Sequence, residues 1–445
     1  MKLIRILSLA ASILLATFPA QGKGKLGFDG EDATSVGIYI KDLTTGKVVM
    51  EHNSSLALTP ASVMKAITTA SVVTKAGIDT CFTTTVGLSG QATEDGWHGN
   101  IIVHASGDPT LESSNFKSYQ GFCDSIAAAL RRRGIQDIDG DIIVKTDMPD
   151  EGPVMQWECE DIAWPYGAGF FGFNWRDNTT TLTPATGTTS PHVPGLEVCV
   201  VPSDSNDLVR GAFSDRLTVY TKGPVKPDRK TDTTVPDPAA VFKYELLHLL
   251  DRKGISLSGD VADASEEEII HVHRSAPFGE IMKSLMVRSD NLFAEGMLRT
   301  LAPGQSRSRA IKKEKEIWAN HGFKPKYTII HDGSGLTRAN RLSPRFIGNV
   351  LEWMSKSKQA GAYTSFFPRA GSDGTMRGFL AKSKTLKGRI ALKTGSVSSV
   401  QCYAGYKLSS KGKPTHVIVI MVNGFFCPRA QVRKSCEDLL TRLFP

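Results

Sequence analysis

The chain has 445 residues, of which 40% are hydrophobic and 22% are charged, and its formal net charge is +8. This composition is that of a folded protein and excludes a disordered chain, while the length predicts two or three domains. The positive charge would favour a polyanionic surface such as a cell wall or anionic lipid, although a generic basic protein has the same balance. No arginine-rich arm or zinc-finger spacing indicates nucleic-acid binding.

The first 22 residues have the pattern of a secretory signal peptide. Lys2 and Arg5 precede an apolar run over residues 6–18, and the segment Ala20-Gln-Gly22 offers small residues for cleavage. The run is too short to span a bilayer, and no other apolar run in the sequence is long enough to do so. We therefore expect an exported protein. A buried N-terminal helix and an uncleaved anchor are the alternatives.

Seven cysteines occur in the sequence, and export would permit disulfides. The odd number predicts at least one thiol that is free or paired between chains. Cys427 and Cys436 are close enough in sequence to form a candidate pair. No C-x-x-C occurs, so we expect no zinc site, and no other metal or cofactor is implied.

The elements begin with a predicted hairpin of strands at 36–42 and 47–51. Thr59 and Pro60 then have the residue types of an N-cap and a first helical position, so a helix is expected from there to about Lys75, ending near Gly77. Ser62 would lie in the first turn of this helix.

From about residue 84 the sequence becomes rich in Gly, Thr, Asp and Asn, with short β-like runs and one predicted helix at 121–133. Asp237 and Pro238 repeat the cap-and-proline signal and open a helix to about Lys253. We predict that residues 84–236 are a mainly β insertion in a catalytic domain made of 23–83 and 237–445. The β-like runs lie at 101–103, 142–144, 179–182, 198–201 and 217–220.

The last part of the sequence alternates between helical and strand patterns. These elements predict an α+β core in which helices flank an antiparallel sheet. The expected helices lie at 277–300, 306–321, 343–356 and 429–443, and the expected strands at 327–331, 389–394, 400–408 and 414–422.

Three short motifs carry most of the chemical information: Ser62-Val-Met-Lys65, Ser289-Asp-Asn291 and Lys393-Thr-Gly395. Each alone fits an ordinary helix, cap or strand end. Together and in this order they supply a nucleophile, a proton acceptor, a proton relay and a positively charged wall. The set therefore predicts acyl transfer through a serine ester.

The residue types suggest a role for each group near the serine. Lys65 lies one helical turn from Ser62 and could accept its proton if burial or nearby Lys393 destabilises the ammonium. Ser289 could relay a proton to the leaving amine. Asn291 could hydrogen-bond both the lysine and a substrate amide.

The third motif ends an apolar strand and offers groups for a substrate carboxylate. Lys393 supplies positive charge, and Thr394 and Ser396 supply hydroxyls. Gly395 permits a ligand to approach the strand closely. The backbone N–H of Ser396 could form an oxyanion hole with that of Ser62.

The chain resembles the class C low-molecular-mass penicillin-binding proteins, the D-alanyl-D-alanine carboxypeptidase/endopeptidase family. Further segments similar to that family extend the resemblance over nearly the whole mature chain. They are Gly107-Asp-Pro-Thr-Leu111, Asp332-Gly-Ser-Gly-Leu336, Ala370-Gly-Ser-Asp-Gly-Thr375 and Tyr403-Ala-Gly-Tyr406. One departure is K-T-G-S in place of the commoner K-T-G-T, which keeps a hydroxyl.

The resemblance implies a transpeptidase-like domain with two inserted β subdomains, located in the periplasm. It implies cleavage of D-Ala–D-Ala bonds or crosslinks in peptidoglycan through a Ser62 acyl-enzyme, which penicillins would also form. Peripheral association with membrane or wall fits this setting, and the oligomeric state stays open. Asp161 would meet the amino group of diaminopimelate, although a solvated acidic loop is the alternative there.

Two other functions are alternatives to this one. A β-lactamase or esterase on the same scaffold would have a shorter spacing between Ser62 and Ser289. A non-catalytic, penicillin-sensing wall-binding protein would be expected to have lost part of the motif set, which is intact here. The balance between carboxypeptidase and endopeptidase action is left open.

Overall fold

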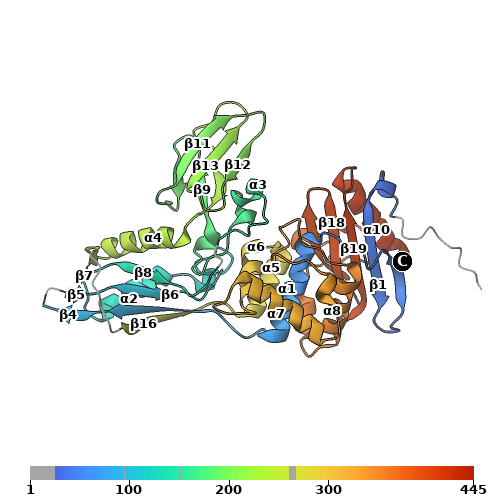
Figure 1. Ribbon diagram of the computed structural model, residues 1–445, viewed down its shortest axis with the longest axis horizontal. Helices are drawn as coiled ribbons and strands as arrows, with labels where there is room; N and C mark the ends of the chain where they lie inside the picture. The colour runs from blue at the N-terminus through green and yellow to red at the C-terminus, as the bar shows by residue number, and fades with distance from the viewer. Residues whose placement is uncertain (1–25, 95, 150–151, 260–266) are drawn as a thin grey trace, which may run out of the picture.

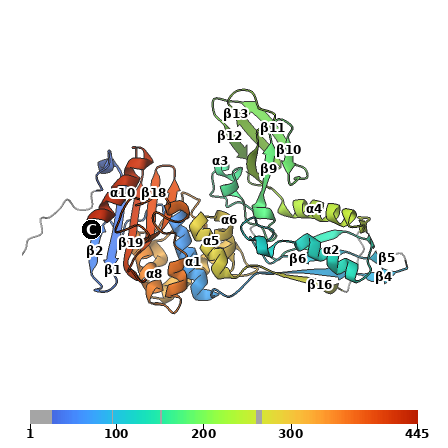
Figure 2. The same cartoon turned by 180° about the vertical axis from the view of Figure 1, so that it is seen from behind.

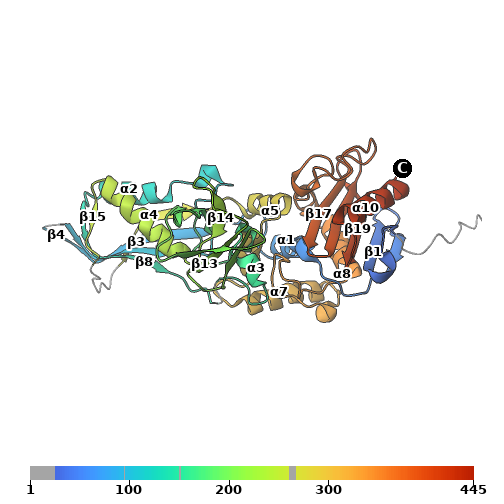
Figure 3. The ribbon, with the colours of Figure 1, turned by 90° about the horizontal axis from the view of Figure 1, so that it is seen from above.

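The computed structural model describes residues 26–94, 96–149, 152–259 and 267–445, so the expected signal peptide at 1–22 lies outside the described residues. The chain forms two parts that lie end to end along the longest axis, and α5 (Phe278–Arg288) lies in the first of them on the side that faces the second (Figure 3). A five-stranded sheet covered by helices makes up one part, and an elongated, β-rich region makes up the other (Figure 1).

The five-stranded sheet joins the beginning of the chain to its end. Its strand order is β17-β18-β19-β1-β2, and every neighbouring pair is antiparallel. Alternation along β19 sends Val419 to the face packed by α1 and α8, and Ile420 to the face packed by α10. The strands are β1 (Ser35–Asp42), β2 (Val48–His52), β17 (Ile390–Val397), β18 (Val400–Leu408) and β19 (Pro414–Asn423).

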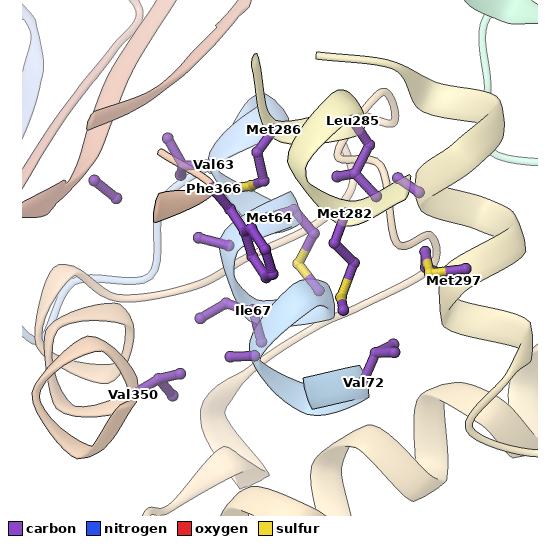
Figure 4. Packing of buried hydrophobic residues seen from close by; sticks show 14 of the residues in the cluster. Val63, Met64, Ile67, Val72, Met282, Leu285, Met286, Met297, Val350 and Phe366 are labelled. Atoms are coloured by element: carbon purple, nitrogen blue, oxygen red, sulfur yellow. The ribbon is translucent and has the colours of Figure 1, made fainter. Parts of the chain in front are cut away.

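Helix α1 is the centre of this part. Ten of its twelve residues are buried, and Met64 and Ile67 pack with Met282 and Leu285 of α5 (Figure 4). A helix that is enclosed by others holds the residues at its start in fixed positions. The helices of this part are α1 (Met64–Lys75), α5 (Phe278–Arg288), α6 (Asn291–Arg299), α7 (Arg307–Asn320), α8 (Pro344–Lys356), α9 (Ala360–Ser365) and α10 (Arg429–Leu443).

Two expectations in this part are corrected. The predicted single helix over 277–300 is two helices, because Ser289 has a left-handed backbone (φ 65°) and Asp290 caps α6. The predicted strand over 327–331 does not form. Only Ile329 makes an isolated bridge to Arg341, because the chain turns in a 3₁₀ helix just before it.

The inserted region begins at β3 and contains a four-stranded sheet, β16-β3-β6-β8, covered by α2 and α4. A second sheet, β15-β7-β5-β4, lies at its far end (Figure 1). These elements are β3 (Thr83–Ser89), β4 (Gln91–Thr93), β5 (Gly96–His98), β6 (Ile101–His104), α2 (Phe122–Arg132), β7 (Asp137–Asp139), β8 (Ile142–Lys145), α4 (Pro238–Arg252), β15 (Ser256–Leu257) and β16 (Glu267–Arg274).

The expected boundary at residue 236 falls inside the packed core of this region. Helix α4 buries Phe242 and Leu246 against Phe122 of α2, and β16 pairs with β3 along its length. The packed unit therefore extends to Arg274, because the apolar face of α4 turns toward the insertion and not toward the catalytic sheet.

A smaller β unit stands beside α4 (Figures 1 and 2). It contains the sheet β11-β13-β12 and the sheet β10-β9-β14, with a separate cluster around Leu208 and Leu217. The elements are α3 (Cys159–Ile162), β9 (Thr179–Thr183), β10 (Thr188–Ser190), β11 (Glu197–Pro202), β12 (Asp207–Arg210), β13 (Arg216–Thr221) and β14 (Thr231–Thr234).

All seven cysteines lie in the described part of the chain, and each is a free thiol. The candidate pair Cys427–Cys436 is therefore not formed. Cys436 is buried on α10 against the catalytic sheet, and Cys427 packs on the same apolar cluster from the loop before the helix. Both sulfurs are used as small apolar groups in packing.

Candidate active site

Ser62 lies at the entrance to α1. Residues Ala61–Val63 form a 3₁₀ turn and α1 begins at Met64, so the expected first helical turn at Pro60 is wrong. Thr59 does not cap the helix, because its Oγ1 donates to the Arg338 carbonyl oxygen at 3.2 Å and accepts from Arg341 Nη1 at 2.8 Å. Its backbone N–H donates to Asn423 Oδ1 at 2.7 Å. This bond ties the turn to the end of β19 and leaves Ser62 facing a cleft.

Lys65 is fully buried behind Ser62 and is held by three acceptors. Its Nζ lies 3.0 Å from Ser62 Oγ, 2.6 Å from Asn291 Oδ1 and 2.6 Å from the carbonyl oxygen of Ser334. Burial lowers the pKa of Lys65 to about 8, against the opposing effect of nearby carboxylates, of which Asp332 is the strongest. Near neutral pH this amine has an appreciable uncharged fraction, and it can then take a proton from the hydroxyl.

Ser289 and Asn291 occupy the break between α5 and α6. The Asp290 carboxylate accepts from the Phe293 N–H at 2.9 Å and so starts α6 at Asn291. Asn291 then faces Lys65 with its carbonyl, while its Nδ2 donates to the Tyr166 carbonyl oxygen at 2.7 Å. Ser289 Oγ accepts a hydrogen bond from Lys393 Nζ at 2.8 Å.

Lys393 is also fully buried, and burial together with the charge of Lys65 holds its pKa well below the usual range. Its Nζ donates to the Thr394 carbonyl oxygen at 2.7 Å in addition to Ser289. Thr394 Oγ1 lies 2.8 Å from Thr375 Oγ1, in the segment Ala370–Thr375. Lys393 therefore joins β17 to the end of α5, and Thr394 joins β17 to the segment Ala370–Thr375.

Gly395 lets β17 run against the turn that carries Ser62. A Cβ at this glycine would lie 2.6 Å from the Pro60 carbonyl oxygen and 3.0 Å from the Ser62 nitrogen. Only glycine permits that approach. It brings Ser396 to the edge of the same cleft as Ser62, an arrangement in which both backbone N–H groups can face one oxyanion.

The cleft has a volume of about 470 Å³ and is shared by both parts of the chain. The inserted region contributes Asp161 and Tyr166, and the Tyr166 hydroxyl donates to Asp161 Oδ1 at 3.0 Å. Of the nine residues singled out from the sequence, Ser62, Asp161, Ser289, Asn291 and Ser396 line the cleft, whereas Lys65, Lys393, Thr394 and Gly395 lie behind or beside it.

The structure adds cleft residues that the motifs did not identify: Tyr166, Arg288, Arg338 and Arg429. Arg338 forms an ion pair with Glu158 at 2.8 Å. It lies just after the segment Asp332–Leu336. The resemblance of that segment to the family was the sequence feature that could have placed Arg338 near the site. Arg288 directly precedes the Ser289 motif and Tyr166 follows Asp161 by five residues, so their positions offered a signal, whereas Arg429 lies far in sequence from every motif.

The segment that delivers the Ser334 carbonyl to Lys65 is fixed by a buried carboxylate. Asp332 accepts from the N–H groups of Gly335 and Thr337, both at 2.8 Å, and from Asn340 Nδ2 at 2.6 Å. The inserted region supplies a fourth donor, Trp157 Nε1, at 2.9 Å. The loop behind the lysine is therefore held by both parts of the chain.

Within the described residues, no three His, Cys, Asp or Glu side chains gather in a way that would hold a metal ion. In the same ranges, every helix is too short or too polar to cross a bilayer.

Residues 28–443 match the D-Ala-D-Ala carboxypeptidase 3 (S13) family. The chain is 26% identical to D-alanyl-D-alanine carboxypeptidase DacB of Haemophilus influenzae, over 94% of this chain and 91% of that protein. The crystal structure of penicillin binding protein 4 (dacB) from that organism has a TM-score of 0.79 at 23% identity and covers 94% of this chain and 99% of its own. Its complex with a β-lactam has a TM-score of 0.74 at 22% identity, with 94% of this chain and all of that chain covered.

The Bd0816 predatory endopeptidase of Bdellovibrio bacteriovorus has the same fold more distantly, with a TM-score of 0.54 at 16% identity over 92% of this chain and 94% of that one. Because the family match covers most of the sequence, the chain belongs to the D-Ala-D-Ala carboxypeptidase 3 (S13) family of serine-type carboxypeptidases. The resemblance inferred from the motifs and the α+β fold class are both confirmed.

Proposed function

We propose that this protein cleaves D-Ala–D-Ala bonds and crosslinks of peptidoglycan through an ester on Ser62. The observation that carries the proposal is the buried Lys65 amine 3.0 Å from the Ser62 hydroxyl. Its lowered pKa makes it a base that can work near neutral pH. Family membership supports the same reaction and the same substrate class.

The reaction has two stages. Uncharged Lys65 takes the proton of Ser62 Oγ, and the oxygen attacks the carbonyl carbon of the penultimate D-Ala. The N–H groups of Ser62 and Ser396 receive the developing oxyanion. The C–N bond then breaks, the proton passes by way of Ser289 to the leaving amine, and an ester remains on Ser62. In the second stage a water molecule gives a proton to Lys65 and attacks the ester carbonyl carbon. The bond from that carbon to Ser62 Oγ breaks, the serine receives the proton from Lys65, and the shortened peptide leaves as a carboxylic acid.

Two ends of the cleft would bind different groups of the substrate. Lys393, Thr394 and Ser396 are assigned to the carboxylate of the residue that leaves, and Gly395 to the close approach of the substrate to β17. At the other end, Asp161 is assigned to the amino group of diaminopimelate. Its place in the cleft supports this role.

The proposal includes the setting of the protein. Peptidoglycan as substrate requires export, and we place the enzyme in the periplasm, with peripheral association with wall or membrane as the arrangement its basic charge would favour. β-Lactams are proposed as acylating inhibitors, in keeping with the β-lactam complex of the H. influenzae protein.

Labelling with a fluorescent penicillin tests the nucleophile. Wild-type protein and a Ser205→Ala control, altered at an exposed serine, should label fully. Ser62→Ala should not label, because no hydroxyl remains to form the ester. Equal labelling of all three proteins would refute the assignment.

Product analysis tests the alternatives. Mass spectrometry of digests of purified muropeptides should show release of D-Ala, cleavage of crosslinks, or both. Rapid turnover of penicillin with intact muropeptides would instead indicate a β-lactamase or esterase. Penicillin binding with no product from either substrate would indicate a non-catalytic sensor.

A further inference from the structure

A second groove, of about 590 Å³, lies along the outer face of α5 beside the catalytic cleft. On the helix side it is lined by Glu280, Lys283, Ser284 and Val287, whose spacing places them on one face. The opposite wall is the segment 115–119 of the inserted region. Nothing in the proposed reaction uses these residues.

The far wall of the groove is anchored to the catalytic core. The Phe116 ring packs against Phe293 of α6, with ring centroids 5.7 Å apart, and is itself buried. The Tyr119 ring contacts Phe116 edge-on at 6.5 Å. Because both walls are anchored to the same core, the groove is formed before any ligand arrives, which lowers the entropic cost of binding.

The groove adjoins one particular end of the cleft. Arg288 lines both of them. On the same side, Thr375 contacts Thr394, and its neighbour Gly374 packs so closely on Val287 that a Cβ there would lie 2.1 Å from the Val287 carbonyl oxygen. The groove therefore leads away from the end to which the leaving residue was assigned.

The charges of the groove favour an anionic ligand. Lys117, Lys283 and Arg288 are exposed around it, and Glu280 is the acidic residue among those that line it. Peptidoglycan stem peptides contain several carboxylates, which such a lining would attract.

We propose that this groove binds the leaving stem peptide of a crosslinked substrate. The inference rests on the proposed function and adds to it a structural basis for endopeptidase action. A terminal D-Ala fits within the cleft and never reaches the groove. The leaving group of a crosslink is a whole stem peptide, which continues past Arg288 and along α5. Occupancy of the groove therefore adds binding energy for crosslinks alone.

The test reverses two charges of the groove, with the double variant Lys117→Glu/Lys283→Glu. The value of kcat/KM for a purified crosslinked muropeptide dimer should fall about tenfold, chiefly through KM. Cleavage of a monomeric pentapeptide and the rate of penicillin labelling should stay near those of the wild type. The matched control is Lys358→Glu/Lys411→Glu, which changes the net charge equally at exposed positions outside the groove.

A second variant, Ser284→Trp, fills the groove without changing its charge and should give the same selective loss on the dimer. If the dimer is cleaved normally by both variants, or if dimer and pentapeptide cleavage fall together, the groove does not bind the leaving stem. A wild-type protein that neither labels with penicillin nor cleaves either peptide would contradict the proposed function itself, so the two failures are distinguishable.

Discussion

Lys65, the proposed base, is the residue whose surroundings control the proposed chemistry. Lys65 Nζ is enclosed by the Ser62 hydroxyl, the Asn291 amide oxygen and the Ser334 carbonyl oxygen. Among the described residues, none of its hydrogen-bond partners is a carboxylate. Neutral acceptors satisfy the amine while stabilising its charged form less than an ion pair would. This is why burial is the dominant effect on its pKa.

The first prediction concerns pH. Because the pKa of Lys65 is lowered to about 8, the charged form dominates below that value and the uncharged base above it. The rate of penicillin acylation should therefore rise between pH 6 and 9 with a midpoint near 8, measured by stopped-flow labelling with circular dichroism as a check on folding. A rate that is flat over this range, or a midpoint above pH 10, would contradict the role of the lysine as base.

A second prediction concerns Glu295, which lies one turn after Asn291 on α6. Its Oε1 accepts from the N–H groups of Gly333 at 3.0 Å and Ser334 at 2.8 Å, and so orients the Ser334 carbonyl toward Lys65. Glu295→Leu leaves both donors unpaired, which costs about 1–3 kcal/mol each. We expect acylation to slow and its pH midpoint to shift.

Glu295→Gln is the matched variant, because it keeps an acceptor of nearly the same shape and should recover most of the rate. A leucine variant that loses thermal stability but acylates at the wild-type rate and pH midpoint would show that Glu295 supports only the fold.

At the scale of elements, the site depends on how closely β17 approaches the turn before α1. Gly395→Ala should push the two apart, because the new Cβ would meet the Pro60 carbonyl oxygen and the Ser62 nitrogen. We expect acylation to slow by at least about tenfold. The upper limit is about a thousandfold, because complete loss of one oxyanion donor costs roughly 3–4 kcal/mol. The control is Gly361→Ala at an exposed position of α9, where a Cβ meets nothing within 4 Å. Equal rates for both variants would show that the approach is not required.

At the scale of the molecule, the inserted region takes part in building the site. Trp157 donates to buried Asp332, and the Tyr166 carbonyl accepts from Asn291. Trp157→Phe should lower the melting temperature and also slow acylation, because Asp332 loses a donor and the loop behind Lys65 loosens.

Trp97→Phe provides the comparison for this prediction. It removes an indole hydrogen bond of 2.8 Å to the Ser89 carbonyl oxygen. Trp97 belongs to β5, which lies at the far end of the insertion from the catalytic part (Figure 1). It should affect stability alone. If the two variants slowed acylation equally, the contact of Trp157 with Asp332 would have no special role in the site.

The sequence by itself determined the features that depend on neighbouring residues. The cap and proline at Asp237 and Pro238 start α4 as expected, and the last two strands lie where their alternation placed them. The three motifs in order indicated acyl transfer through a serine, because they supply the nucleophile, base and relay that this chemistry needs. Together with the spacing between Ser62 and Ser289 and further segments such as Gly107–Leu111, they identified the family.

Only the tertiary structure decided what depends on contacts between distant segments. The extension of the insertion to Arg274, the Ser334 carbonyl on Lys65 and the entry of Arg338 into the cleft are of this kind. The unpaired thiols of Cys427 and Cys436 are another. Local propensity and periodicity are encoded within a few residues, whereas the partner of a buried donor or an apolar face is chosen by the packing of the whole chain.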